Sequence, residues 1–150
     1  DLSLPRGQEI AHSLFEQADV IVENYRPGVM SRFGLDYASI QAQYPSLVYC
    51  SISGFGQTGP DAQRAAYAPI AHAASGYDTA HMRAQVITKQ AADAAPTASG
   101  IMIADILTGA YAFGAIQTGL LGRINSGKGD HIDITMVESM MSLIVHATFV

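Results

Sequence analysis

A long, nearly uncharged segment constrains the fold more than any other feature of the sequence. Between Ala98 and Gly122 the only charged residue is Asp105. A stretch of this length could span a bilayer or form a helix inside a protein core. The glycines, threonines and glutamine of the segment, and Asp105 itself, favour a buried core helix at Ile101–Leu121. The membrane alternative would be excluded by a protein that is soluble without detergent.

Short apolar runs alternate with helical patterns along the rest of the chain. Val20–Val22 and Leu47–Ser53 are rich in β-branched and apolar residues, which is typical of parallel strands buried on both faces. A third strand, half-buried, is predicted at His131–Met136 because polar and apolar residues alternate there. Helices are predicted from their apolar periodicity at Arg6–Gln17, Val29–Phe33, Tyr37–Gln43, Pro69–Ser75 and Val137–Val150.

This alternation indicates an α/β fold with an open, mainly parallel, Rossmann-like sheet and helices on both faces. Tyr77–Pro96 shows no clear period and is predicted to be an irregular surface segment, and Arg123–Gly129 is predicted to be a polar loop. The pattern begins with a helix that lacks a preceding strand, and it ends within a helix. We therefore expect residues 1–150 to be an incomplete domain of a longer protein.

Composition argues against several classes of function. The formal net charge is −5, and eight Lys and Arg residues are scattered along the chain, so no basic face for nucleic acid is expected. A single cysteine, Cys50, permits no disulfide within the chain and no cysteine-based metal cluster. No grouping of His, Asp and Glu has the spacing of zinc ligands, so we expect no metal. No secretory signal pattern is present at the N-terminus, which predicts a cytoplasmic location.

Candidate site residues lie just after the predicted strands. Asn24–Gly28 and Gly54–Pro60 follow the carboxyl ends of two strands, the edge at which open parallel sheets bind ligands. Asp105 lies in the first turns of the predicted core helix, where the helix dipole favours an anion. Its apolar neighbours are expected to exclude water and make the carboxylate more nucleophilic. On these residues alone, a catalytic carboxylate and a buried structural aspartate explain Asp105 equally well.

Four sequence motifs follow one another along the chain. The first and longest is VIVENYRPGVMSRFG at residues 20–34. The others are LVYCSISGFGQTGP at residues 47–60, IADI with Gly109 at residues 103–109, and SGKGDHID at residues 126–133. Together they cover nearly the whole chain except Tyr77–Pro96, and in this order they resemble the motifs of the class III CoA-transferases, a family with a divergent α-methylacyl-CoA racemase branch.

The resemblance implies roles for individual residues. The catalytic aspartate of the family corresponds to Asp105, and the asparagine and arginine that contact CoA correspond to Asn24 and Arg32. Tyr67 stands where transferases often carry tyrosine and racemases carry a catalytic histidine, so it is a further predicted CoA-binding residue. His72 does not match the racemase histidine. A lysine that contacts the nucleotide in some members would fall near Ala65 and is absent.

The activity implied by the resemblance is transfer of CoA between carboxylic acids through an aspartyl-CoA thioester. The chain would be part of the large, CoA-binding domain, without the N-terminal strands, the small domain or the C-terminal part of the family. A homodimer is also implied. Two alternatives remain: an acyl-CoA racemase that moves the α-proton, and a CoA-binding module without catalysis.

Overall fold

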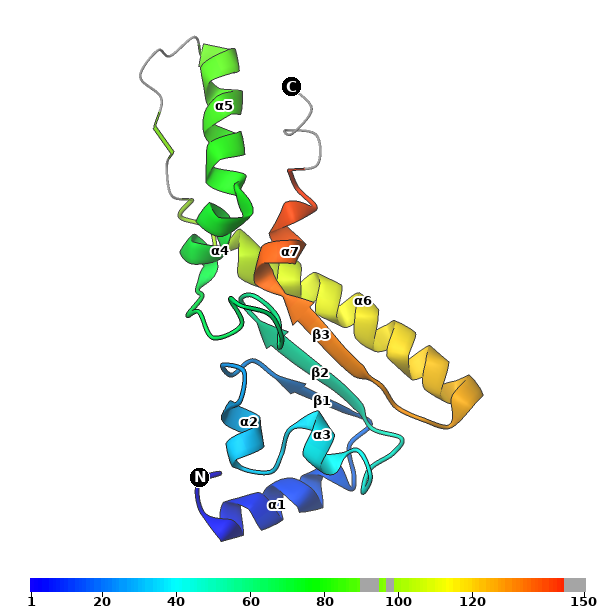
Figure 1. Ribbon diagram of the computed structural model, residues 1–150. Coiled ribbons are helices and arrows are strands. Elements are labelled where there is room, and N and C mark those ends of the chain that lie inside the picture. The colour runs from blue at the N-terminus through cyan, green and yellow to red at the C-terminus, as the bar shows by residue number, and fades with distance from the viewer. Residues whose placement is uncertain (90–94, 97–98, 145–150) are drawn as a thin grey trace.

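The computed structural model describes residues 1–89, 95–96 and 99–144, and its centre is a three-stranded parallel sheet (Figure 1). The strands are β1 (Val20–Glu23), β2 (Val48–Ser53) and β3 (His131–Thr135), in the order β1-β2-β3. Cys50 of the central strand pairs with Val22 on one side and with Ile132 on the other. The predicted parallel pairing of the first two strands is therefore confirmed. The sequence of β2 is mainly apolar because helices cover both faces of this strand and neighbouring strands cover both its edges.

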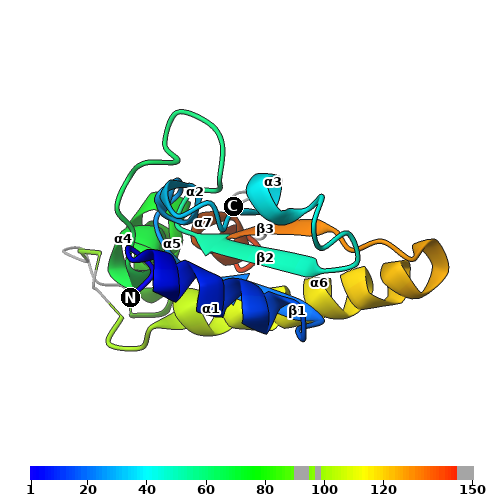
Figure 2. The same ribbon diagram turned by 90° about the horizontal axis from the view of Figure 1, so that it is seen from below.

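Three helices cover one face of the sheet: α1 (Pro5–Phe15), α2 (Val29–Arg32) and α3 (Tyr37–Ile40). Figure 2 shows α2 and α3 on the side of the sheet opposite to α6. Leu35 is fully buried between α1 and α2. Tyr49 of β2 packs against α3, and its hydroxyl donates a hydrogen bond of 3.0 Å to the Leu35 carbonyl. This bond ties the helical layer to the sheet.

The other face carries α6 (Ile103–Ser126), which lies along β2 and β3 (Figure 1). The helix approaches the sheet through small side chains: Ala104, Thr108 and Ala112 are buried. A methyl group built on Gly119 would lie 3.3 Å from both Val48 and Ile132, so the helix is also close to the sheet near its far end. The predicted loop after residue 122 is wrong in its first half, since the helix continues to Ser126.

The expectation that Ile101–Leu121 is a core helix buried mostly by this chain is also wrong. Its outer side exposes large apolar residues, among them Ile106, Phe113, Leu121 and Ile124, which are 64–76 % exposed. We call these four residues the outer stripe of α6. The sequence pattern is apolar all round, but a three-stranded sheet can cover only one side of a helix. In the described ranges, no helix is both long and apolar enough to cross a membrane.

Another hydrophobic cluster lies beyond the carboxyl ends of the strands. It joins α4 (Ala68–Ser75), the start of α6 and α7 (Met136–Met141). Its buried members are Ala68, Ala71, Ala104, Met136 and Met140. The predicted C-terminal helix begins one residue earlier than expected, because Thr135 caps it by accepting a hydrogen bond from the Glu138 amide. Residues 145–150 of that prediction lie outside the described residues.

The segment predicted to be irregular from Tyr77 contains a helix, α5 (Tyr77–Lys89). It follows α4 directly, and Gly76 makes the break with a φ of +84°. Figure 1 shows α5 projecting away from the sheet. Among its described side chains only Tyr77, at the start of the helix, is an apolar residue packed against a core, so the apolar periodicity that identifies most helices is missing here. Residues 90–94 lie outside the described part of the chain.

Candidate active site

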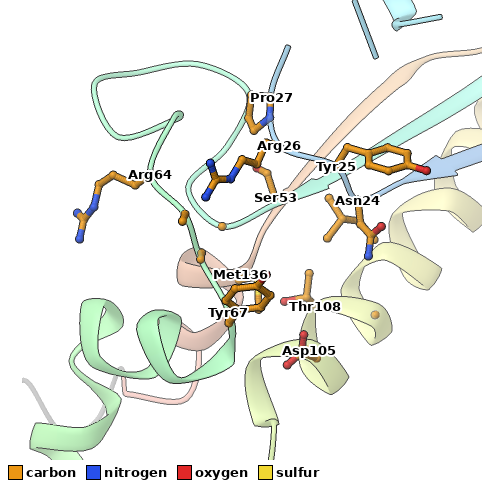
Figure 3. A pocket seen from close by; sticks show the side chains of 15 residues that line it. Asn24, Tyr25, Arg26, Pro27, Ser53, Arg64, Tyr67, Asp105, Thr108 and Met136 are labelled. Atoms are coloured by element: carbon orange, nitrogen blue, oxygen red, sulfur yellow. The ribbon is translucent and has the colours of Figure 1, made fainter. Parts of the chain in front are cut away.

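A cavity of about 430 Å³ opens at the carboxyl ends of β1 and β2. This is the edge at which the sequence predicts a ligand site. The end of β1, the loop before α4 and the first turns of α6 form its walls (Figure 3). The lining residues are Asn24, Tyr25, Arg26, Pro27, Ile52, Ser53, Gly54, Arg64, Ala65, Ala66, Tyr67, Asp105, Thr108, Gly109 and Met136.

Asp105 lies in the first turn of α6, where unpaired amides and the helix dipole favour a carboxylate. The side chain is exposed. Within the part of the chain that the structure describes, its carboxylate accepts no hydrogen bond. The expected exclusion of water from the carboxylate is wrong in this structure. Ile103, Ala104 and Leu107 do pack into the hydrophobic cluster of α4, α6 and α7, but Ile106 is 68 % exposed and Asp105 itself is exposed. The carboxylate is thus available to a ligand in the cavity.

Two of the predicted CoA-binding residues share this cavity with Asp105. Asn24 directly follows β1, and Figure 3 shows its amide directed toward α6. Its turn is held by Glu23, a buried carboxylate that accepts a hydrogen bond of 2.9 Å from the Tyr25 amide. Tyr67 precedes the first residue of α4 and is 76 % exposed. The three side chains come from three different elements.

Arg32, the third predicted CoA-binding residue, is not brought into the cavity. It is the last residue of α2 and is exposed. Two other arginines, Arg26 and Arg64, line the cavity instead. The Arg64 guanidinium lies 4.4 Å from the centre of the Phe55 ring and 3.3 Å from an Asp61 carboxylate oxygen. The sequence analysis assigned neither arginine to the site, because their convergence depends on the path of the loop after β2.

That loop is positioned by close contacts. A methyl group on Gly54 would lie 2.1 Å from the Ala66 Cβ, so only glycine lets the loop return this closely before Tyr67. The Ser53 hydroxyl accepts a hydrogen bond from the Gly56 amide, and the Asp133 carboxylate accepts one from the Gln57 amide, each of 2.9 Å. The loop is therefore fastened to β2 and to β3. It then carries Arg64 and Tyr67 to the cavity wall.

The side chain of His72 is buried and does not line the cavity. Its Nε2 atom lies 3.1 Å from the backbone nitrogen of Ala104, the residue before Asp105. A buried histidine outside the cavity is not placed to act on a substrate there, in agreement with the prediction that His72 does not match the racemase histidine. Sequence reasoning gave this histidine no role, because the two residues are 32 positions apart in the chain.

The fold and the cavity define an α/β protein with a free carboxylate at the ligand-binding edge of a parallel sheet. A profile of the family described as CoA-transferase family III matches residues 1–149, and the chain belongs to this family. The resemblance drawn from the four motifs is confirmed.

Similar proteins agree with this assignment. The chain is 38 % identical over 146 residues to a succinate–glutarate CoA-transferase of Agrobacterium fabrum, covering 97 % of this chain and 34 % of the relative. It is 39 % identical over 142 residues to a human succinyl-CoA:glutarate CoA-transferase, covering 95 % and 31 %. An acetyl-CoA:oxalate CoA-transferase of Acetobacter aceti is 38 % identical over 135 residues, covering 89 % and 33 %. The chain thus spans about a third of the length of these curated relatives.

Solved structures also match. A CAIB/BAIF family protein from Brucella suis superposes with a TM-score of 0.84 at 36 % identity, covering 99 % of this chain and 37 % of that one. A hypothetical protein from Mycobacterium tuberculosis reaches a TM-score of 0.87 at 23 % identity, covering 99 % and 40 %, and this likeness concerns the fold alone. The predicted parallel α/β architecture is confirmed.

Proposed function

We propose that the protein containing this chain transfers CoA between carboxylic acids, with Asp105 as the covalent nucleophile. The observation that carries the proposal is the free Asp105 carboxylate, which faces one cavity together with Asn24 and Tyr67. In this proposal the chain is part of the large, CoA-binding and catalytic domain. The names of the reported relatives support the reaction class.

The carboxylate acts by splitting one difficult transfer into easier steps. A carboxylate oxygen of Asp105 attacks the thioester carbonyl, forms a mixed anhydride and releases CoA as the thiolate. The thiolate then attacks the Asp105 carbonyl, which forms the aspartyl-CoA thioester and releases the first acid as its carboxylate. The acceptor carboxylate then attacks the carbonyl of this thioester, which forms a second mixed anhydride and releases the CoA thiolate. The thiolate attacks the acceptor's acyl carbonyl of that anhydride, which forms the new acyl-CoA and releases Asp105 as its carboxylate.

The substrates we propose are small dicarboxylic acids and their CoA thioesters. The reported relatives are named for succinate, glutarate and oxalate. Such acids carry a second carboxylate that does not react and that needs a cationic partner. Arg26 lines the cavity and is our first candidate for this partner. Arg64 also lines it, but its guanidinium is stacked on Phe55 and paired with Asp61, so it would have to turn to reach the substrate. Asn24, Tyr67 and Arg32 are proposed to contact CoA, with Arg32 contacting a part of CoA that extends beyond the cavity.

The cavity supports transfer better than racemisation. A racemase needs an acid and a base on opposite faces of the α-carbon. In the described part of the chain, Asp105 is the only carboxylate that lines the cavity, and no histidine lines it. We further propose a homodimer, as the family resemblance implies. The cytoplasmic location and the absence of a metal stay predictions from the sequence.

Replacing Asp105 by asparagine tests the function in the full-length enzyme. An amide cannot form the anhydride, so we expect Asp105→Asn to lower kcat by several orders of magnitude, roughly 4 kcal/mol or more in activation free energy. CoA binding, measured by calorimetry, should remain within a few-fold of wild type. Mass spectrometry after hydroxylamine trapping should find a modified Asp105 in the wild type given succinyl-CoA, and none in the variant.

Asp130→Asn is the matched control, because Asp130 is exposed and does not line the cavity. It should transfer CoA at the wild-type rate. Transfer by Asp105→Asn within tenfold of wild type would refute the nucleophile assignment. Exchange of the substrate α-proton with solvent deuterium, without transfer, would indicate the racemase branch, and CoA binding without either reaction would indicate a binding module.

A further inference from the structure

His72 makes a contact that the proposed reaction does not yet use. The residue lies on α4 and is 1 % exposed. Its Nε2 atom lies 3.1 Å from the Ala104 backbone nitrogen. Because a backbone N–H can only donate, Nε2 is the acceptor, and the imidazole is neutral with its hydrogen on Nδ1.

The contact satisfies a group that α6 cannot satisfy itself. Ala104 is the second residue of the helix, and the first four amides of a helix have no partner within it. The residue that precedes the helix, Met102, makes no side-chain capping bond. An acceptor from another element, α4, therefore caps α6. Since Ala104 is buried, the amide has no access to water in place of His72.

Further contacts hold both partners in place. The Ala104 carbonyl accepts a hydrogen bond of 2.5 Å from the Thr108 hydroxyl, so both backbone groups of the residue before Asp105 are bonded to side chains. The His72 ring lies 5.5 Å from the Tyr77 ring, measured between centroids. Tyr67, which directly precedes the first residue of the helix that carries His72, lines the same cavity as Asp105.

We propose that His72 is a positioning residue that fixes the first turn of α6, and with it the Asp105 carboxylate, relative to the wall that carries Tyr67. The inference rests on the proposed function of Asp105. A covalent nucleophile must lie within a narrow range of distance and angle from the carbonyl that it attacks. The His72–Ala104 bond sets that geometry by joining two elements whose relative position the sheet does not determine.

The test compares two variants of the full-length enzyme. His72→Gln keeps a side-chain acceptor, whereas His72→Phe keeps a planar ring of similar size without one. We expect His72→Phe to lower kcat roughly 10- to 100-fold, the scale on which a small misplacement of a reacting group acts, with KM within about threefold of wild type. His72→Gln should restore kcat to within about fivefold. His72→Leu serves as the second variant without an acceptor if the phenylalanine does not fit.

Amide hydrogen exchange gives a readout that is independent of activity. The Ala104 amide should exchange about tenfold faster or more in His72→Phe than in wild type, and at nearly the wild-type rate in His72→Gln. Unchanged exchange in both variants without an acceptor would overturn the inference. Equal loss of kcat in all variants, with a matching fall in thermal midpoint, would also overturn it by showing a merely structural role. An inactive wild-type enzyme would instead refute the proposed function, while the exchange measurement would still decide whether His72 caps α6.

Discussion

Cys50 shows how the sheet controls the chemistry of a single side chain. The thiol belongs to the central strand and has no exposed surface. Burial, with smaller effects from Glu23 and Asp133, raises its pKa from 9.0 to about 11. The thiolate is the form that reacts with oxidants and disulfide reagents. The burial of Cys50 in the central strand therefore lowers the reactivity of its thiol.

We predict that Cys50 does not react with a disulfide reagent at pH 8 in the native protein and reacts fully after denaturation, as peptide mass spectrometry can measure. The raised pKa also gives a pH dependence. Folding favours the protonated thiol, so this contribution to stability is complete below about pH 9 and is lost as the pH rises through about 11. The thermal midpoint should fall more steeply over this range in wild type than in Cys50→Ala. Equal slopes would contradict the assignment.

At the residue scale, the sequence led to some site residues and not to others. Asp105 could be found because it is the only charge in a long apolar segment, and Asn24 and Tyr67 because they match family motifs. Arg26 and Arg64 could not be assigned, because a surface arginine and a cavity arginine look alike until the loop path is known. His72 was not found because a capping contact between distant elements leaves no local pattern.

At the scale of elements, the contact between α6 and the sheet depends on small residues. A methyl group on Gly119 would lie 3.3 Å from Val48 and from Ile132, whereas Gly122 has no neighbour within 4 Å of such a group. Close packing of this kind lets one long helix lie along two strands. Larger side chains at Gly119 would separate the layers.

We therefore predict that Gly119→Leu lowers the free energy of unfolding by about 1–3 kcal/mol, because overpacking outweighs the better helix propensity of leucine. Gly122→Leu is the matched control, since it gains the same propensity without the contact, and it should be neutral or stabilising. Thermal unfolding of the two variants measures the difference. A Gly119→Leu variant as stable as its control would show that the helix and sheet are less closely packed than the structure indicates.

Helices and strands whose apolar residues face a core could be predicted from the sequence, because burial leaves a pattern of apolar positions. Elements that bury little apolar surface could not. The strands β1 and β2 were found because buried parallel strands are continuously apolar and rich in β-branched residues. The helix α5 was missed because, among its described residues, it packs against a core only at its start, through Tyr77, and so leaves no apolar period in the sequence. For α6 the prediction of a helix was confirmed, but its apolar outer stripe was misread as a buried surface. Composition does not specify which part of the protein covers a given face.

At the scale of the whole molecule, the outer stripe of α6 remains to be accounted for. Exposed apolar surface of this extent on a single helix marks an interaction site or a region covered by other parts of a longer protein. Met141 and Leu143, at the end of α7 and just beyond it, are also about half exposed. The chain spans about a third of the length of its curated relatives, and in proteins of that length further segments are present beside the matched part.

We predict that residues 1–150, produced alone, self-associate at micromolar concentration, and that Phe113→Glu with Leu121→Glu reduces the association. Static light scattering measures both. Ser126→Glu with Thr118→Glu is the control, because it adds the same charge to exposed polar positions of α6. In the longer protein the stripe variants should instead lower the thermal midpoint. If residues 1–150 are monomeric and the stripe variants change neither their association nor the thermal midpoint of the longer protein, the outer stripe is not a contact surface.

The order of the strands also has a consequence for the time course of synthesis. β2 can pair with β1 once synthesis has passed residue 53, but β3 follows only after residues 54–130 have been made. At ribosomal speeds this second connection takes roughly 4–15 s to synthesise. During that interval one edge of β2 has no neighbour, and an open strand edge can pair with another chain. The nascent protein therefore passes through a period of seconds in which a chaperone could bind the strand that later becomes the centre of the sheet.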